Sequence, residues 1–248
     1  MNSNRLYGAD LAFIHDVGFA GHARRATPAL LAILRQSAIT AGLVVDLGCG
    51  SGIWARELAQ SGYDVLGVDV SSAMIRLSKK RVPRGRFMKG SLFRIELPRC
   101  VAVTALGECF NFMPEGWGRD NLLRHLFSEV FEALNPGGVF IFDLAEPGRE
   151  TEPHRRYFEG RGWVVLLEVE LDPGRDRLTR RITCFRRVGR FYKRSVEIHR
   201  IQLWRRSFIL EELRGAGFRV RTMSGYGKYR FPRGVVGFLA QKSRSGRL

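Results

Sequence analysis

The chain has 248 residues, 45% of them hydrophobic, which is enough for one domain with a full core and a small additional element. Its formal net charge is +17, and residues 155–248 hold 24 basic and 8 acidic residues, whereas residues 1–154 are close to neutral. No apolar run reaches the roughly 18 residues that a membrane-spanning helix needs, and the N-terminus lacks the unbroken apolar stretch of a signal peptide. We therefore expect a cytoplasmic protein without membrane association, and we make no prediction of its oligomeric state.

The charge and the cysteines each have a simple interpretation. Of the 41 basic residues 35 are Arg, a bias that is typical of a GC-rich genome. A partner of opposite charge, either an anionic macromolecule or a charged small substrate, is the alternative. The four cysteines are scattered, with no CxxC pair and no histidine at a metal-ligand spacing, so we expect reduced thiols and no metal.

The first half of the chain alternates between strand-like and helix-like segments. Residues 1–39 are expected to be a helical segment, in which Thr27 is the predicted N-cap and Pro28 the first helical residue. Further along the chain we predict a regular succession, with strands at 43–47, 63–70, 86–89, 100–106 and 139–144, and helices at 53–60, 72–81 and 120–134. A turn is expected at 135–138, where the sequence reads NPGG. This alternation predicts a parallel sheet covered by helices on both faces.

The pattern changes after residue 154. Segments 163–171, 177–187 and 191–204 alternate as antiparallel strands, and we interpret residues 155–204 as a small β insertion. A helix at 209–214 and strands at 218–223 and 235–240 then return to the main sheet. The predicted organisation is therefore an N-terminal segment at 1–39, a main domain at 40–154 and 205–248, and an insertion at 155–204.

The segment VVDLGCGSG, residues 44–52, places an acid and three glycines at the end of a buried strand. In open parallel sheets, ligands bind beyond the carboxyl ends of the strands. Gly48, Gly50 and Gly52 alternate, so the segment does not fit the GxGxxG pattern of dinucleotide binding. Asp46 would repel a pyrophosphate but attract a cationic ligand, and Asp69, at the next strand end, is placed to accept hydrogen bonds from ribose hydroxyls. The predicted ligand is a nucleoside with a cationic tail, and S-adenosylmethionine fits.

Five segments in order resemble the class I S-adenosylmethionine-dependent methyltransferases: VVDLGCGSG, LGVDVSSAMI, FMKGSLFRIELP, VAVTALGECFNFM and LNPGGVFIFDL. The resemblance covers residues 40–145 and extends to the last strand pair. It implies a doubly wound, Rossmann-like α/β fold, with a mostly parallel seven-stranded sheet and a reversed final hairpin. The antiparallel β insertion is added to that sheet.

The resemblance also implies a donor site. The glycine loop would lie beside the methionine part of the donor, with Asp46 near its ammonium group, and Asp69 would bind the ribose. Many family members have an acid after the third strand that binds the adenine, but this chain has Ser91 and Leu92 there. The full set of expected donor-binding residues is Asp46, Gly48, Cys49, Gly50, Gly52, Asp69, Val70, Ser91, Leu92, Leu106 and Gly107.

Candidates for an acceptor-side base are few. Glu108 follows the fourth strand, and His15 lies in the front segment, which covers the donor in many relatives. Glu197 and His199 alternate on one strand and therefore face the same side. Each also has an ordinary interpretation, as a loop acid, a structural histidine or a solvent-facing pair. Tyr7 is a further candidate for covering the donor.

We therefore expect methyl transfer to a nitrogen or oxygen of a small-molecule acceptor. The chain lacks the [DN]PP[YFW] motif of nucleic-acid amine methyltransferases, because it reads GECFNF after the fourth strand. A nucleic acid is the less favoured partner. The alternatives are an RNA methyltransferase that uses the basic C-terminal half and a non-catalytic protein that binds S-adenosylmethionine.

Overall fold

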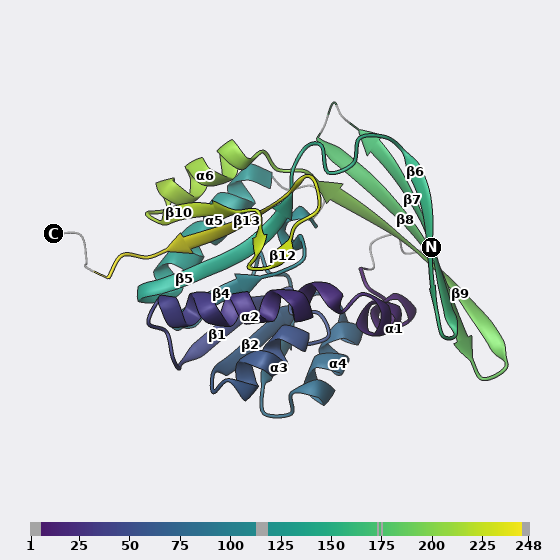
Figure 1. Ribbon diagram of the computed structural model, residues 1–248, viewed down its shortest axis with the longest axis horizontal. Coiled ribbons are helices and arrows are strands. Elements are labelled where there is room, and N and C mark those ends of the chain that lie inside the picture. The colour runs from purple at the N-terminus through teal and green to yellow at the C-terminus, as the bar shows by residue number, and fades with distance from the viewer. Residues whose placement is uncertain (1–5, 113–118, 173, 175, 245–248) are drawn as a thin grey trace.

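The computed structural model describes residues 6–112, 119–172, 174 and 176–244. Residues 1–5 of the predicted N-terminal segment therefore lie outside the described part. The main domain and a second, smaller sheet lie side by side, and α1 is placed between them (Figure 1). None of the helices within the described residues is both long and apolar enough to cross a membrane.

The main sheet has seven strands in the order β10-β13-β5-β4-β1-β2-β3. The strands β1 to β5 run parallel to one another, whereas β13 runs antiparallel to both β5 and β10. The expected parallel sheet with a reversed final hairpin is therefore confirmed. The strands of this sheet are β1 (Leu43–Leu47), β2 (Asp64–Asp69), β3 (Arg86–Lys89), β4 (Cys100–Ala105), β5 (Leu134–Ala145), β10 (Arg219–Met223) and β13 (Val235–Gln241).

Helices cover both faces of the sheet, because successive side chains of a strand point to opposite faces. Val45 packs in a core cluster with apolar residues of α5 and α6, and Val44 packs in a second cluster with those of α2 and α3. Figure 1 shows the two layers on either side of the sheet. The helices of the main domain are α2 (Gly21–Gln36), α3 (Ile53–Gln60), α4 (Ser72–Arg81), α5 (Arg119–Ala133) and α6 (Arg206–Gly215).

The second sheet has four antiparallel strands rather than the three that were expected. They are β6 (His154–Gly160), β7 (Trp163–Asp172), β8 (Arg177–Val188) and β9 (Phe191–Gln202). The sequence of β6, HRRYFEG, is too polar to show a strand period, and the segment is a strand because it pairs along β7. Helix α1 (Ala9–Gly18) packs against the inner face of this sheet, where Ile14 meets Trp163 and Ile182.

Three local predictions were wrong. Helix α2 begins at Gly21, so Pro28 lies inside it, and Thr27 does not cap the helix but donates its hydroxyl to the carbonyl of Ala23. Ser and Thr side chains commonly turn back to the preceding turn in this way. The segment 135–138, predicted as a turn, is part of β5, and it forms an irregularity there, because the pairing with β4 passes from Leu134 directly to Val139. Sequence analysis also missed the 3-10 helix η1 (Cys109–Asn111) and a short hairpin of β11 (Gly225–Tyr226) and β12 (Tyr229–Arg230).

Candidate functional site

A cavity of about 570 Å³ lies at the carboxyl ends of β1, β2 and β4. The loops after these strands form one side, and Leu6, Tyr7 and residues of α1 and α2 form the other. Ile198 and Arg200 of β9 also line it. The cavity is therefore bounded by both sheets and by the N-terminal segment, and it is large enough for a nucleoside-sized ligand and a small second molecule.

The glycine loop after β1 gives the cavity its floor. Gly48, Gly50 and Gly52 all have positive φ angles, of 73°, 53° and 76°, which favour glycine. Gly48 and Gly50 line the cavity, and a Cβ atom added to Gly50 would meet no atom within 4 Å. Gly52 does not line the cavity but lies against α4, where a Cβ atom added to it would be 2.9 Å from Cβ of Ser78. Gly50 thus leaves room for a ligand, whereas Gly48 lies too close to Cys109, and Gly52 too close to Ser78, for either to carry a Cβ atom.

Asp46 is a buried carboxylate beside this loop. In the sheet it lies opposite Gly67 of β2 and Thr104 of β4, and the Thr104 hydroxyl donates to its Oδ1 at 2.8 Å. Burial raises the pKa of Asp46 from its ordinary value of 3.8 to about 7, against the hydrogen bond from Thr104, and the nearby charge of Asp69 adds to the rise. A carboxylate of this kind is stabilised by a cation.

Asp69 connects the end of β2 to the glycine loop. Its Oδ2 accepts the N–H of Gly50 at 2.9 Å, and its Oδ1 accepts the N–H of Ser71 at 2.8 Å. Burial raises its pKa, although these two N–H groups oppose the rise. Each carboxylate oxygen keeps a further lone pair for a hydroxyl of a ligand. The other expected donor-site residues that line the cavity are Cys49, Val70, Ser91, Leu92, Leu106 and Gly107.

Glu108, which we named as a candidate acceptor-side base, does not line the cavity. Its φ of 62° is unusual for a residue with a side chain. Its Oε1 accepts from Arg149 Nε and its Oε2 from Arg180 Nη2, both at 3.1 Å. Arg180 belongs to β8, so Glu108 joins the loop after β4 to the second sheet.

Glu197 and His199 face the same side of β9 and form a pair, with Glu197 Oε2 2.9 Å from His199 Nε2. Neither is among the residues that line the cavity. Glu197 Oε1 accepts the backbone N–H of Gly8 at 2.8 Å, and the buried His199 ring lies 5.2 Å from the ring of Tyr7. The pair therefore holds the N-terminal segment. Ser71 anchors the same segment from the main domain, because its hydroxyl donates to the carbonyl of Tyr7.

His15 lines the cavity. The other three candidate acceptor-side bases, Glu108, Glu197 and His199, do not. Its Nδ1 is buried and has no hydrogen-bond partner among the described residues. Burial lowers the pKa of His15 from 6.5 to about 4, against the attraction of Asp16. Its imidazole is therefore neutral near pH 7, and its unpaired Nδ1 is buried in the wall of the cavity.

Sequence analysis missed a buried network around Asp143, at the end of β5. The carboxylate of Asp143 accepts the N–H groups of Gly107, at 3.0 Å, and Glu108, at 2.8 Å, and the hydroxyl of Tyr226, at 2.9 Å. His22 Nε2 lies 3.3 Å away, within ion-pair distance but outside hydrogen-bond geometry. His22 Nδ1 is 3.0 Å from the hydroxyl of Tyr229, and His22 also lines the cavity. The loop that holds Leu106 and Gly107 is thus fixed by one carboxylate.

Asp143 and His22 shift each other's pKa. Burial alone would raise the pKa of Asp143, but contact with His22 and the two backbone N–H groups outweigh it and lower the pKa. Burial alone would lower the pKa of His22, but contact with Asp143 outweighs it and raises the pKa. An acidic residue at the end of a predicted strand is a sequence pattern that could have identified Asp143, as it identified Asp46 and Asp69. Nothing in the sequence points to His22.

The site fits a nucleoside with a cationic group. An open glycine backbone, a buried carboxylate that a cation would stabilise and a strand-end acid for hydroxyls meet in one cavity. Within the described ranges, no group of three His, Cys, Asp or Glu side chains is arranged to hold a metal ion. The strand order and the reversed β13 define the class I S-adenosylmethionine-dependent methyltransferase fold.

Comparison with known proteins agrees with this class. The structure resembles an S-adenosylmethionine-dependent methyltransferase from Clostridium acetobutylicum, with a TM-score of 0.81 at 17% identity over 94% of this chain and 97% of that one. It also resembles the sugar N-methyltransferase KedS8 from Streptoalloteichus, with a TM-score of 0.74 at 19% identity over 98% of each chain.

A curated relative, malonyl-[acyl-carrier protein] O-methyltransferase from Serratia marcescens, is 26% identical over 44% of this chain and 40% of its own length. The chain thus spans less than half of that relative. Residues 44–138 match the family described as "Methyltransferase domain". The chain therefore has the class I S-adenosylmethionine-dependent methyltransferase fold, and its residues 44–138 match the methyltransferase-domain family.

Proposed function

We propose that this protein transfers a methyl group from S-adenosylmethionine to a nitrogen or oxygen of a small molecule. The observation that carries the proposal is the single cavity that joins the glycine loop, Asp46 and Asp69 to a second region under the N-terminal segment. The similar proteins include a sugar N-methyltransferase and an O-methyltransferase, and they support both acceptor atoms.

Methyl transfer from a sulfonium is an in-line displacement, so the protein mainly aligns two molecules and excludes water. The donor supplies an activated methyl group. Asp46 would hold its ammonium, Asp69 would accept from its ribose, and Leu6 and Tyr7 would cover it. His15 is the group placed to accept a proton from the acceptor, or to orient it.

The experiment that tests the proposal has two stages. Calorimetry should show micromolar binding of S-adenosylhomocysteine and no binding of NAD. Release of S-adenosylhomocysteine should then be measured with a panel that holds amino sugars, malonyl-acyl carrier protein and transcribed RNA. Turnover with RNA alone would favour an RNA methyltransferase, and tight donor binding without turnover on a broad panel would favour a non-catalytic binding protein.

Donor affinity should depend on pH through Asp46. Because the folded protein holds this carboxyl protonated below about pH 7, a cationic donor must displace its proton there. We expect the dissociation constant to weaken by about tenfold for each pH unit below 7, and to level off above. Calorimetry from pH 5.5 to 8.5 measures this.

The matched control is Asp46→Asn, which should bind more weakly and with little pH dependence. The raised pKa also makes the free energy of unfolding of the ligand-free protein fall as the pH rises from about 4 to about 7. A flat affinity profile in the wild type would remove Asp46 from the ammonium site.

Replacing His15 by phenylalanine should lower turnover by about 100-fold and leave donor affinity within about twofold, because only the acceptor side loses a polar group. Steady-state kinetics and calorimetry separate the two effects. The control is His125→Phe, an exposed position on α5, which should change neither. An equal loss in donor affinity would place His15 at the donor instead.

A further inference from the structure

The turn between β8 and β9 projects from the second sheet, away from the main domain (Figure 1). Three large apolar side chains are exposed at its end: Phe191 at 68%, Tyr192 at 58% and Val188 at 53%. Arginines alternate with them in the sequence RRVGRFYKR, which contains no acid. We call Arg187, Val188, Arg190, Phe191, Tyr192 and Arg194 the tip patch.

The basic residues of this segment divide into two sets. Arg186 and Lys193 point inward and pair with Asp10 of α1, at 3.4 and 3.1 Å. Arg187, Arg190 and Arg194 are exposed and form no ion pair with any residue that the structure describes. The tip patch therefore carries three positive charges that the fold does not use.

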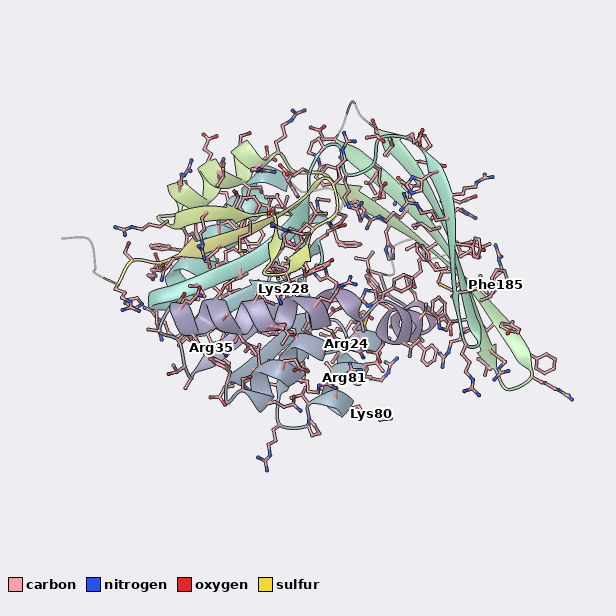
Figure 2. The ribbon with its side chains drawn as sticks, in the orientation of Figure 1. Arg24, Arg35, Lys80, Arg81, Phe185 and Lys228 are labelled. Carbon is pink, nitrogen blue, oxygen red and sulfur yellow. The ribbon has the colours of Figure 1, made fainter. Side chains whose placement is uncertain are left out.

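The neighbouring turn of β6 and β7 extends the positive region. The N–H of Arg187 donates to the carbonyl of Gly162 at 2.8 Å, which brings the exposed Arg161 beside the tip patch. One acid, Glu159, lies in the same cross-strand row as Arg194, through Val164 and Phe185. Figure 2 labels Phe185 on this sheet and shows side chains extending outward from the end of the hairpin.

We propose that the tip patch binds single-stranded nucleic acid. Guanidinium groups bind phosphates through paired hydrogen bonds, and exposed aromatic rings stack on unpaired bases. The tip patch provides both on one hairpin, and Arg190 already lies 5.2 Å from the ring centre of Phe191. A chain with a net charge of +17 also attracts polyanions over a long range.

Charge and composition favour nucleic acid over two other possible partners of the tip patch, a second copy of the chain and an anionic membrane. Binding of a second copy of the chain would place like charges against each other. The chain has fewer acidic than basic residues to pair with the arginines of the tip patch. An anionic membrane would attract the arginines, but the apolar side chains here are interrupted by charges and include no Leu, Ile or Trp. The tip patch does not line the cavity, so this binding is independent of the proposed methyl transfer.

Fluorescence anisotropy with labelled 20-nucleotide oligo(U) and oligo(dT) tests the proposal. The triple variant Arg187→Gln, Arg190→Gln, Arg194→Gln should bind at least about tenfold more weakly at 50 mM salt. Its slope of log affinity against log salt should be smaller by about 2, from three phosphate contacts at roughly 0.7 each. The double variant Phe191→Ser, Tyr192→Ser should lose at least about fivefold, as stacking predicts.

The matched control removes the same charge elsewhere, with Arg76→Gln, Lys80→Gln and Arg84→Gln on and after α4, all of them exposed. It should retain nearly wild-type affinity. Equal losses in the two triple variants, or full affinity in the aromatic variant, would overturn the proposal. Wild-type binding weaker than about 100 μM at 50 mM salt, or tighter binding to phosphatidylglycerol vesicles than to the oligonucleotides, would also overturn it.

Discussion

Replacing Asp143 by alanine should lower the free energy of unfolding by about 3–5 kcal/mol, the largest loss that we expect from a single substitution in the site. The change leaves buried donors from Gly107, Glu108 and Tyr226 without an acceptor, and it leaves His22 without its partner. Urea unfolding measures the loss. Because the same carboxylate holds the cavity loop, donor affinity should fall as well.

The control for Asp143 is Glu170→Ala, which removes an exposed carboxylate from β7 and should change stability by less than about 0.5 kcal/mol. The pH dependence gives a second check. The lowered pKa of Asp143 contributes stability that is lost as the pH falls below about 4, and the raised pKa of His22 contributes stability that is lost as the pH rises above about 6.5. The difference between wild type and variant should therefore be greatest between these values. A difference that stays constant from well below about pH 4 to well above about pH 6.5 would contradict the ion pair.

Replacing Asp69 by alanine should weaken donor binding by roughly 10- to 150-fold, because a charge-assisted hydrogen bond contributes about 1.5–3 kcal/mol. The change removes the expected acceptor of the ribose hydroxyls, and it also releases Gly50 in the loop that lies under the donor. Calorimetry with S-adenosylhomocysteine measures the loss.

Asp64→Ala is the matched control, since Asp64 begins the strand that Asp69 ends and is exposed. It should bind the donor as the wild type does. Wild-type affinity in Asp69→Ala would remove the ribose assignment. If Asp69→Ala binds the donor weakly and also unfolds at a much lower urea concentration than the wild type, the loss of affinity comes from disruption of the glycine loop.

The donor half of the site was predictable because its signals are local. Asp46 and the glycines that follow it belong to one strand and one turn, and the parallel sheet brings Asp69 beside them. Asp143 follows the same rule of an acid at a strand end. We missed it because the next glycine, Gly148, comes five residues after it, whereas Gly48 comes two residues after Asp46.

The acceptor half depends on packing between distant segments, which no local pattern encodes. The side of β9 that carries Glu197 and His199 was predicted, but what it faces depends on where the N-terminal segment lies. Glu108 turns towards two arginines because its loop has a left-handed backbone there. His22 meets Asp143 only because α2 covers the end of β5.

The position of β13 has a consequence for synthesis. This strand is the last one along the described chain, yet it lies inside the sheet, between β5 and β10. Until the ribosome has added residues 235–241, β5 has an open edge, with a row of unpaired N–H and C=O groups in an apolar segment. Residues 44–138, which match the methyltransferase-domain family, are made before this, but the sheet that they form is closed only when β13 is added. The nascent chain thus has its greatest tendency to aggregate between the synthesis of β5 and that of β13, and a chaperone would act in that interval.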